Sequence, residues 1–160
     1  MKVRSPQLSL RLEAAPAAAT RWHEGAELPF LGGRLLLKLA TREQSAAAAG
    51  QVLHLSLPPG ATPRQIQDAA EAWLRREATL FIDAALRRLC PGAAPRWRFS
   101  FAARGNWTEV RPDATLRLNW RLIEQPLPMI EQSLARALAT LRAASPAPLP
   151  DLLGAPAFAA

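Results

Sequence analysis

The chain has 160 residues, of which 49% are hydrophobic, 21% charged and 6% aromatic. This balance predicts one domain with a buried core, and it excludes a wholly disordered chain, a collagen-like repeat and a disulfide-stapled miniprotein. The 20 basic residues exceed the 13 acidic ones, which gives a formal net charge of +7. All but two of the basic residues are arginines. Alanine, leucine and proline are also abundant, so the charge alone is weak evidence for nucleic-acid binding.

The single cysteine and the short apolar stretches bear on disulfide formation, zinc binding and the location of the protein in the cell. Cys90 has no partner for an intrachain disulfide and cannot build a zinc site by itself. Uninterrupted apolar runs such as Leu35–Leu37 are too short to span a bilayer, and the first residues lack the apolar segment of a secretory signal. We therefore expect a cytoplasmic protein that does not contact a membrane.

The first third of the chain predicts an irregular leader followed by a hairpin. Residues 1–27 include the low-complexity run Ala14–Ala19 and indicate no regular structure. Residues 34–39 and 51–57 are strand candidates, and the leucines of the second alternate with Val52, His54 and Ser56. The polar, alanine-rich segment between them would form a loop that joins the two strands as a hairpin.

A long helix is predicted from Pro63 to about Leu89. Thr62 is a suitable N-cap, proline is favoured at the first helical position, and Gln65 completes a capping box. Pro91-Gly92 ends the helix. Apolar residues approximate one buried stripe along it: Ile66, Ala70, Trp73, Phe81, Ala84 and Leu89.

Two alternating strands, at 96–101 and 116–121, and a helix at about 129–143 follow. The expected fold class is α+β: a small antiparallel sheet with a long helix and a C-terminal helix packed against it. Residues 28–144 would form the domain. Residues 145–160 are rich in proline and alanine, which predicts a disordered tail.

The alternation leaves two interpretations open for the basic residues and two for the tryptophans. If the strands are neighbours, four arginines share a face and form a basic patch suited to phosphate, the alternative being a plain solvated face. They are Arg96, Arg98, Arg117 and Arg121. Trp97, Trp107 and Trp120 would either stack on bases or peptides, or pack into the core as strand aromatics commonly do.

The segment Leu116–Pro126, which reads LRLNWRLIEQP, resembles a signature of the YgjP-like metallopeptidase family. Trp107 lies at that family's spacing before Asn119-Trp120, and the compatible order extends over roughly residues 28–142. The resemblance implies a zincin-type scaffold related to SprT-like domains. It also implies a following helix with a His-Glu-x-x-His motif, whose histidines bind zinc and whose glutamate activates the bound water.

The residues at the motif positions depart from that pattern. Arg136 and Thr140 stand where the two histidines would lie, and Ala137 stands where the glutamate would lie. An arginine is not deprotonated in proteins and does not ligate a metal, and an alanine cannot transfer a proton. No residue of 145–160 replaces the family's third histidine. The remaining strong ligands, His23, His54 and Cys90, have no zinc-site spacing. We therefore expect no metal and no cofactor.

The resemblance and its departures predict a catalytically inactive member of the family, a pseudoenzyme that binds a protein or peptide partner. The partner would use the former cleft, which comprises Trp107, Glu109, Asn119, Trp120, Arg136 and Thr140. Arg136 would pair there with Glu109 or Glu131 or bind an anion, unless it is a solvated helix arginine. The alternative is a basic nucleic-acid-associated module. A genuine zinc metallopeptidase requires ligands that the sequence does not supply.

Overall fold

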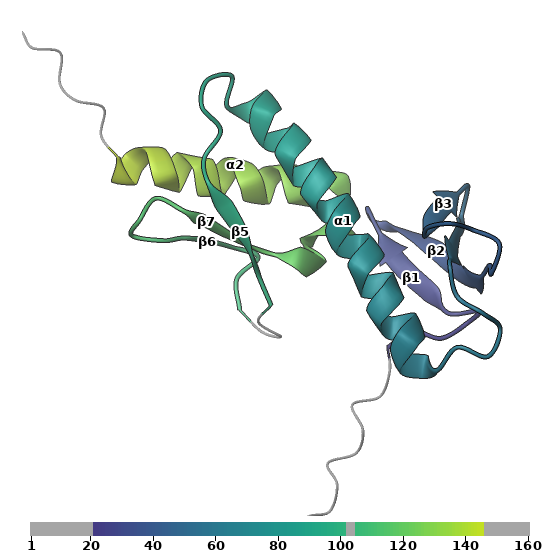
Figure 1. Ribbon diagram of the computed structural model, residues 1–160. Coiled ribbons are helices and arrows are strands. Elements are labelled where there is room, and N and C mark those ends of the chain that lie inside the picture. Colours follow the sequence, from purple (N-terminus) through teal and green to yellow (C-terminus); the bar gives the residue numbers. More distant parts are fainter. Residues whose placement is uncertain (1–20, 102–104, 146–160) are drawn as a thin grey trace, which may run out of the picture. The chain divides into compact units, whose positions relative to one another are not determined.

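The computed structural model describes residues 21–101 and 105–145, and Figure 1 labels most of their helices and strands. Most of the expected leader and nearly all of the expected tail lie outside these ranges. The chain divides into two compact units, one made of residues up to 28 with 35–72, the other of 29–34 with residues from 73 onward. The α+β class is confirmed, with two small sheets, a long helix and a C-terminal helix. No helix within the described ranges has the length and apolar character needed to cross a membrane.

The first unit contains most of a four-stranded sheet with the order β1-β2-β4-β3. Its strands are β1 (Glu27–Phe30), β2 (Gly33–Leu39), β3 (Ala47–Ala49) and β4 (Val52–Leu55). The expected hairpin between β2 and β4 is wrong, because these strands pair in parallel with Leu37 opposite Leu53. The short strand β3 lies in the expected loop and forms an antiparallel pair with β4, so β4 returns in the direction of β2.

The core of the first unit includes one residue from the expected leader. Trp22 is buried at 2% exposure, and its backbone N–H donates to Oε1 of Gln67 at 3.0 Å. Gln67 belongs to the long helix α1 (Pro63–Leu89), whose predicted start is confirmed. The N–H of Gln65 donates to Oγ1 of Thr62, and the N–H of Thr62 donates to Oε1 of Gln65, which is a capping box.

The buried stripe of α1 differs from the prediction in its second half. Ala84 is exposed, and Phe81 and Leu89 are half-buried. The buried positions instead include residues that recur every four positions: Ile66, Ala70, Leu74, Ala78, Ile82 and Leu86. Because a helix turns once in about 3.6 residues, a spacing of four moves the buried stripe around the helix by roughly 40° per step. An apolar stripe that runs straight along one side therefore does not describe the buried face of a helix of 27 residues.

The second unit contains a three-stranded sheet with the order β5-β7-β6. Its strands are β5 (Trp97–Ser100), β6 (Thr108–Val110) and β7 (Leu116–Asn119). The expectation of an antiparallel sheet is wrong here too, because β5 and β7 are parallel and only β6 is antiparallel to β7. The chain passes through β6 before it reaches β7, and the tight β6–β7 turn returns it to the direction of β5.

Strand β7 ends earlier than predicted. Oδ1 of Asn119 accepts a hydrogen bond from the backbone N–H of Arg121 at 3.0 Å and caps the short 3-10 helix η1 (Trp120–Glu124). Trp120 and Arg121 therefore lie in this helix and do not continue the alternation of the strand. After Gln125 and Pro126 the chain enters α2 (Leu127–Ala144), which buries Ile130, Leu134, Ala137 and Leu138.

The turn between β1 and β2 is held against η1 and the start of α2. Leu31 and Gly32 both have positive φ, at 48° and 79°, which is the backbone twist that a two-residue hairpin needs. Their N–H groups donate to the carbonyls of Ile123, at 2.8 Å, and Glu124, at 3.3 Å. A Cβ on Gly32 would lie 2.9 Å from Cα of Pro126. Only glycine combines this backbone conformation with this close approach.

We expect Gly32→Ala to lower the free energy of unfolding by about 2 kcal/mol or more, because the left-handed backbone and the contact with Pro126 both oppose a side chain. Urea denaturation followed by circular dichroism measures the change. Gly60→Ala is the matched control, since no atom lies within 4 Å of its added Cβ. Equal stability of the two variants would contradict this account of the turn.

Candidate functional site

The residues predicted to form the former cleft do not share one environment in the structure. Asn119 and Trp120 are buried at the end of β7 and the start of η1. Trp107 is half-buried, and its carbonyl accepts the N–H of Asn119 at 2.8 Å. Glu109 is exposed on β6, and Arg136 and Thr140 are exposed on α2. Asn119 and Trp120 thus contribute to the local fold, whereas the side chains of Glu109, Arg136 and Thr140 are exposed to solvent.

Of the three residues predicted at the motif positions, Arg136 and Thr140 lie on the exposed side of α2 and Ala137 on its buried side. Ala137, at the position of the glutamate, is 3% exposed. The hydroxyl of Thr140 donates to the carbonyl of Arg136 at 3.0 Å, a bond within the helix. A zinc ion does not fit this set, because an arginine, an alanine and a helix-bonded threonine offer neither imidazole nor carboxylate.

The acidic partners considered for Arg136 are occupied by other arginines. Glu109 pairs with Arg111 at 3.1 Å and with Arg117 at 3.9 Å. Glu131 forms an ion pair with Arg88 of α1. Among the described residues Arg136 forms an ion pair with neither glutamate, and the solvated helix arginine is the interpretation that its exposure supports.

The other candidate metal ligands are dispersed. His23 is exposed, and its Nδ1 lies 3.0 Å from the carbonyl oxygen of Glu24. His54 is half-buried on β4 in the first unit, and Cys90 follows α1 in the second. Nη2 of Arg142 lies 3.7 Å from the sulfur of Cys90. Across residues 21–101 and 105–145, no three His, Cys, Asp or Glu side chains form a group that could hold a metal ion.

The tryptophans pack mainly as core residues. Nε1 of Trp97 donates to Asp83 of α1 at 2.9 Å, and its ring meets Phe99 edge-on at 5.0 Å. Trp120 is 8% exposed. The Arg75 guanidinium carbon lies 5.9 Å from the ring centroids of both Trp120 and Phe101. Contacts within the unit therefore occupy Trp97 and Trp120, and the structure favours the core interpretation over a stacking platform.

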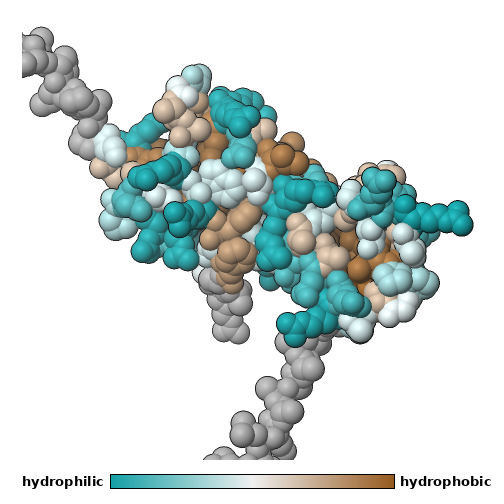
Figure 2. Space-filling view, in the orientation of Figure 1, coloured by the Kyte–Doolittle hydropathy of each residue, from teal (hydrophilic) through white to brown (hydrophobic). Residues whose placement is uncertain are grey.

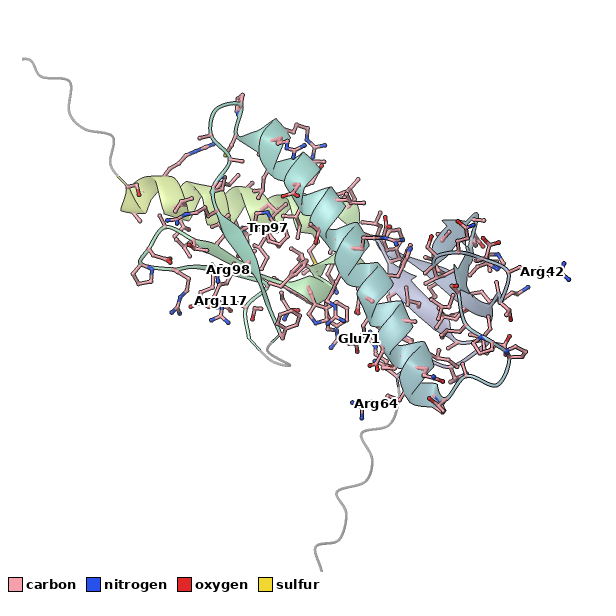
Figure 3. The ribbon with its side chains drawn as sticks, in the orientation of Figure 1. Arg42, Arg64, Glu71, Trp97, Arg98 and Arg117 are labelled. Atoms are coloured by element: carbon pink, nitrogen blue, oxygen red, sulfur yellow. The ribbon has the colours of Figure 1, made fainter. Side chains whose placement is uncertain are left out.

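The β5-β7-β6 sheet has one buried face and one arginine-bearing face. Leu116 and Leu118 are fully buried, so Arg117 between them lies on the other face. Arg98 of β5 lies directly opposite Arg117, and Glu109 of β6 lies opposite it on the other side. Side chains directly opposite each other on paired strands share a face. Figure 3 shows Arg98 and Arg117 close together on this part of the fold.

Two further arginines extend this face along the strands. Arg96 precedes Arg98 by two residues, and its carbonyl accepts the N–H of Leu116. Arg111 follows Glu109 by two residues, and its N–H donates to the carbonyl of Thr115. We name Arg96, Arg98, Arg111 and Arg117 the arginine face. Figure 2 shows mainly hydrophilic side chains around β6 and β7.

The arginine face lines a cavity of about 450 Å³. The lining residues are Arg96, Arg98, Phe99, Arg111, Asp113, Thr115 and Arg117. At its rim the backbone N–H of Thr115 donates to Asp113 at 3.1 Å. This hydrogen bond, with help from the positive charge of Arg96, holds the pKa of the Asp113 carboxyl below its ordinary value. Asp113 is thus ionised at neutral pH and fixes the β6–β7 turn.

Three of the four arginines predicted to form a basic patch lie together in the structure. Arg121 belongs to η1 and pairs with the buried carboxylate of Glu124 at 3.4 Å, so it lies outside the cavity. Arg111, Asp113 and Thr115 were not expected in the site. The sequence feature that could have indicated them is Pro112-Asp113, which favours a turn. A hairpin turn at this point places Arg111 beside the residues that precede β7.

The comparisons with known proteins identify the family. The model of the YgjP-like, metallopeptidase domain matches residues 4–132, which end four residues before Arg136. Comparisons with curated proteins and with solved structures return no match. The match covers most of the 160 residues, including β7, η1 and the first turns of α2. The chain therefore belongs to the YgjP-like metallopeptidase-domain family.

Proposed function

We propose that this YgjP-like domain does not hydrolyse peptides and acts as a binding module. The observation that carries the proposal is the side-chain set at the positions that the resemblance assigns to the zinc-binding motif, which consists of Arg136, Ala137 and Thr140. Zinc hydrolysis needs ligands for the metal and a base for its water, and this set supplies neither. The family match ends at residue 132, before this segment, and is consistent with a departure there.

The burial of Ala137 gives this proposal a structural basis beyond residue identity. In a working site the glutamate must reach the metal-bound water. Here the side chain at that position is 3% exposed and packs with Ile130, Leu134 and Leu138 on the buried side of α2. Restoring the glutamate would place a carboxylate in this apolar contact. The loss of catalysis therefore involves the packing of the helix as well as its chemistry.

The exposed side of α2 is the surface that we assign to a protein or peptide partner. Arg136 and Thr140 lie one helical turn apart on this side and present a cation and a small polar group. Met129, about two helical turns before Arg136 and on the same side of the helix, is 36% exposed. A mixed apolar and cationic surface of this kind suits a peptide better than it suits a metal-bound substrate.

A second candidate function, a nucleic-acid-associated module, is favoured by a different observation. The cavity of the second unit is lined by four arginines on the opposite face of the sheet from the core. This surface is separate from the exposed side of α2. The two candidates therefore involve different residues and can be tested independently.

We expect Ala137→Glu to lower the free energy of unfolding by about 2 kcal/mol or more, because it buries a charged group in an apolar contact. Chemical denaturation of the purified variant measures this change. Ala139→Glu is the matched control, since Ala139 is exposed on the same helix and its substitution should change stability little. If Ala137→Glu were as stable as Ala139→Glu, the position would be open and the helix would still accommodate a catalytic glutamate.

Binding at the α2 surface is tested with peptides selected from a random library on the full chain. We expect the double variant Arg136→Ala, Thr140→Ala to bind them about fivefold more weakly or worse, the effect of removing one significant interface contact. Thr41→Ala with Arg42→Ala is the matched control, because both residues are exposed in the first unit. Equal affinity of the two double variants would contradict the assigned surface. Zinc-dependent cleavage of the bound peptides would contradict the loss of catalysis.

A further inference from the structure

The arginine face carries more positive charge than its own fold neutralises. Four arginines meet two carboxylates, those of Glu109 and Asp113, which leaves a net charge of +2 around the cavity. Glu109 is shared between Arg111 and Arg117. Among the described residues neither Arg96 nor Arg98 forms an ion pair with a carboxylate, although Asp113 acts on Arg96 through its charge. The uncompensated charge is therefore divided between Arg98 on β5 and the pair Arg111 and Arg117, which share one carboxylate.

The register of the sheet places like charges side by side. Arg98 and Arg117 lie directly opposite each other on parallel strands. Neighbouring strands are about 4.8 Å apart, and like charges directly opposite destabilise a sheet. An anion between the two guanidinium groups would remove this repulsion. The arrangement is therefore unfavourable for the isolated sheet and favourable for one that binds an anion.

The geometry of the guanidinium group indicates the type of anion. Arginine presents a planar fork of N–H donors that matches the oxygens of a phosphate in two parallel hydrogen bonds. The arginine face has two rows, with Arg98 and Arg117 in one, and Arg96 and Arg111 in the next. Residues two apart on a strand lie about 6.6 Å apart, so the two rows offer two separate pairs of guanidinium groups, which is more than one phosphate needs. A chain of phosphates fits this layout better than a single one.

We propose that the arginine face binds the phosphodiester backbone of a single-stranded nucleic acid. Arg98 and Arg117 hold one phosphate, and Arg96 and Arg111 hold a neighbouring one. The cavity lies on the sheet face away from the core, and charged surfaces of this kind can follow a single strand by its backbone. The net charge of +7 on the whole chain increases the encounter rate with a polyanion. This inference names the ligand of the second candidate function and rests on it, but it does not depend on the loss of catalysis.

The proposal is tested on the full chain by fluorescence anisotropy with a short labelled oligothymidylate at several salt concentrations. We expect Arg98→Gln with Arg117→Gln to weaken binding about tenfold or more. We also expect this variant to reduce the slope of log affinity against log salt by about 0.7, the value for one lost phosphate contact on a single strand, because both arginines hold the same phosphate. Arg98→Lys should retain most of the salt slope, since it keeps the charge and loses only the fork.

Arg42→Gln with Arg64→Gln is the matched control, because it removes the same charge from exposed arginines of the first unit (Figure 3). We expect its affinity to stay close to that of the unchanged chain. Thermal unfolding of each variant verifies that the fold is retained, and Arg98→Lys provides a second variant if the double substitution fails to fold.

Four results would overturn the proposal. The first is no binding of the oligothymidylate by the unchanged chain, and the second is an equal loss in both double variants. The third is displacement of the oligothymidylate by inorganic phosphate at the same phosphate concentration, which would indicate a site for one free phosphate. The fourth is equally strong competition by polyglutamate, which would indicate an acidic protein partner. None of these results bears on peptide binding at α2 or on the absence of peptidase activity, so failure of this proposal is distinguishable from failure of the proposed function.

Discussion

The close approach of Gly32 to Pro126 determines how the second unit is assembled. The left-handed turn at Leu31 and Gly32 donates two backbone hydrogen bonds to η1 and leaves no room for a side chain beside Pro126. Helix α2 begins at the next residue, so this contact fixes where the helix starts. The apolar spacing of Ile130, Leu134 and Leu138 then sets which side of the helix faces inward. Ala137 is consequently inside, and Arg136 and Thr140 are outside.

The same assembly gives the sheet its two unlike faces. Leu116 and Leu118 pack inward, so Arg117 and its neighbours on β5 and β6 face outward. The surface assigned to a peptide and the surface assigned to a phosphodiester chain thus come from separate elements of one unit. In our proposal, a member of a metallopeptidase family that lacks the zinc ligands offers binding surfaces that do not depend on zinc chemistry. The family membership comes from the match, and the binding roles are our proposals.

Short sequence patterns correctly predicted the helices, whose hydrogen bonds join residues that are close in the sequence. The capping box at Thr62 and Gln65 marks the start of α1, and the apolar spacing from Ile130 to Leu138 marks the buried side of α2. Strand pairing was predicted wrongly because it depends on short strands that alternation does not reveal. The three-residue strands β3 and β6 each form a hairpin with the following strand and so reverse the relation between the longer ones.

The candidate site was predictable to a similar degree. Alternation placed Arg98 and Arg117 on one face, which the sheet register confirms. Arg121 was wrongly included because the side chain of Asn119 ends the strand and starts η1, an interaction that spacing alone does not show. Arg111 was missed because it reaches the face through the β6–β7 turn. The six residues assigned to the former cleft were placed by family resemblance, and their contacts depend on packing that no sequence pattern specifies.

The most direct test of the central claim is the zinc content per chain, measured by elemental analysis of untagged protein purified without chelators. The account predicts a value near zero, because Arg136, Ala137 and Thr140 offer neither the ligands nor the base of the family's motif. One zinc per chain would contradict it. His23, His54 and Cys90 would then become the ligands to test, and peptidase activity would again have to be considered.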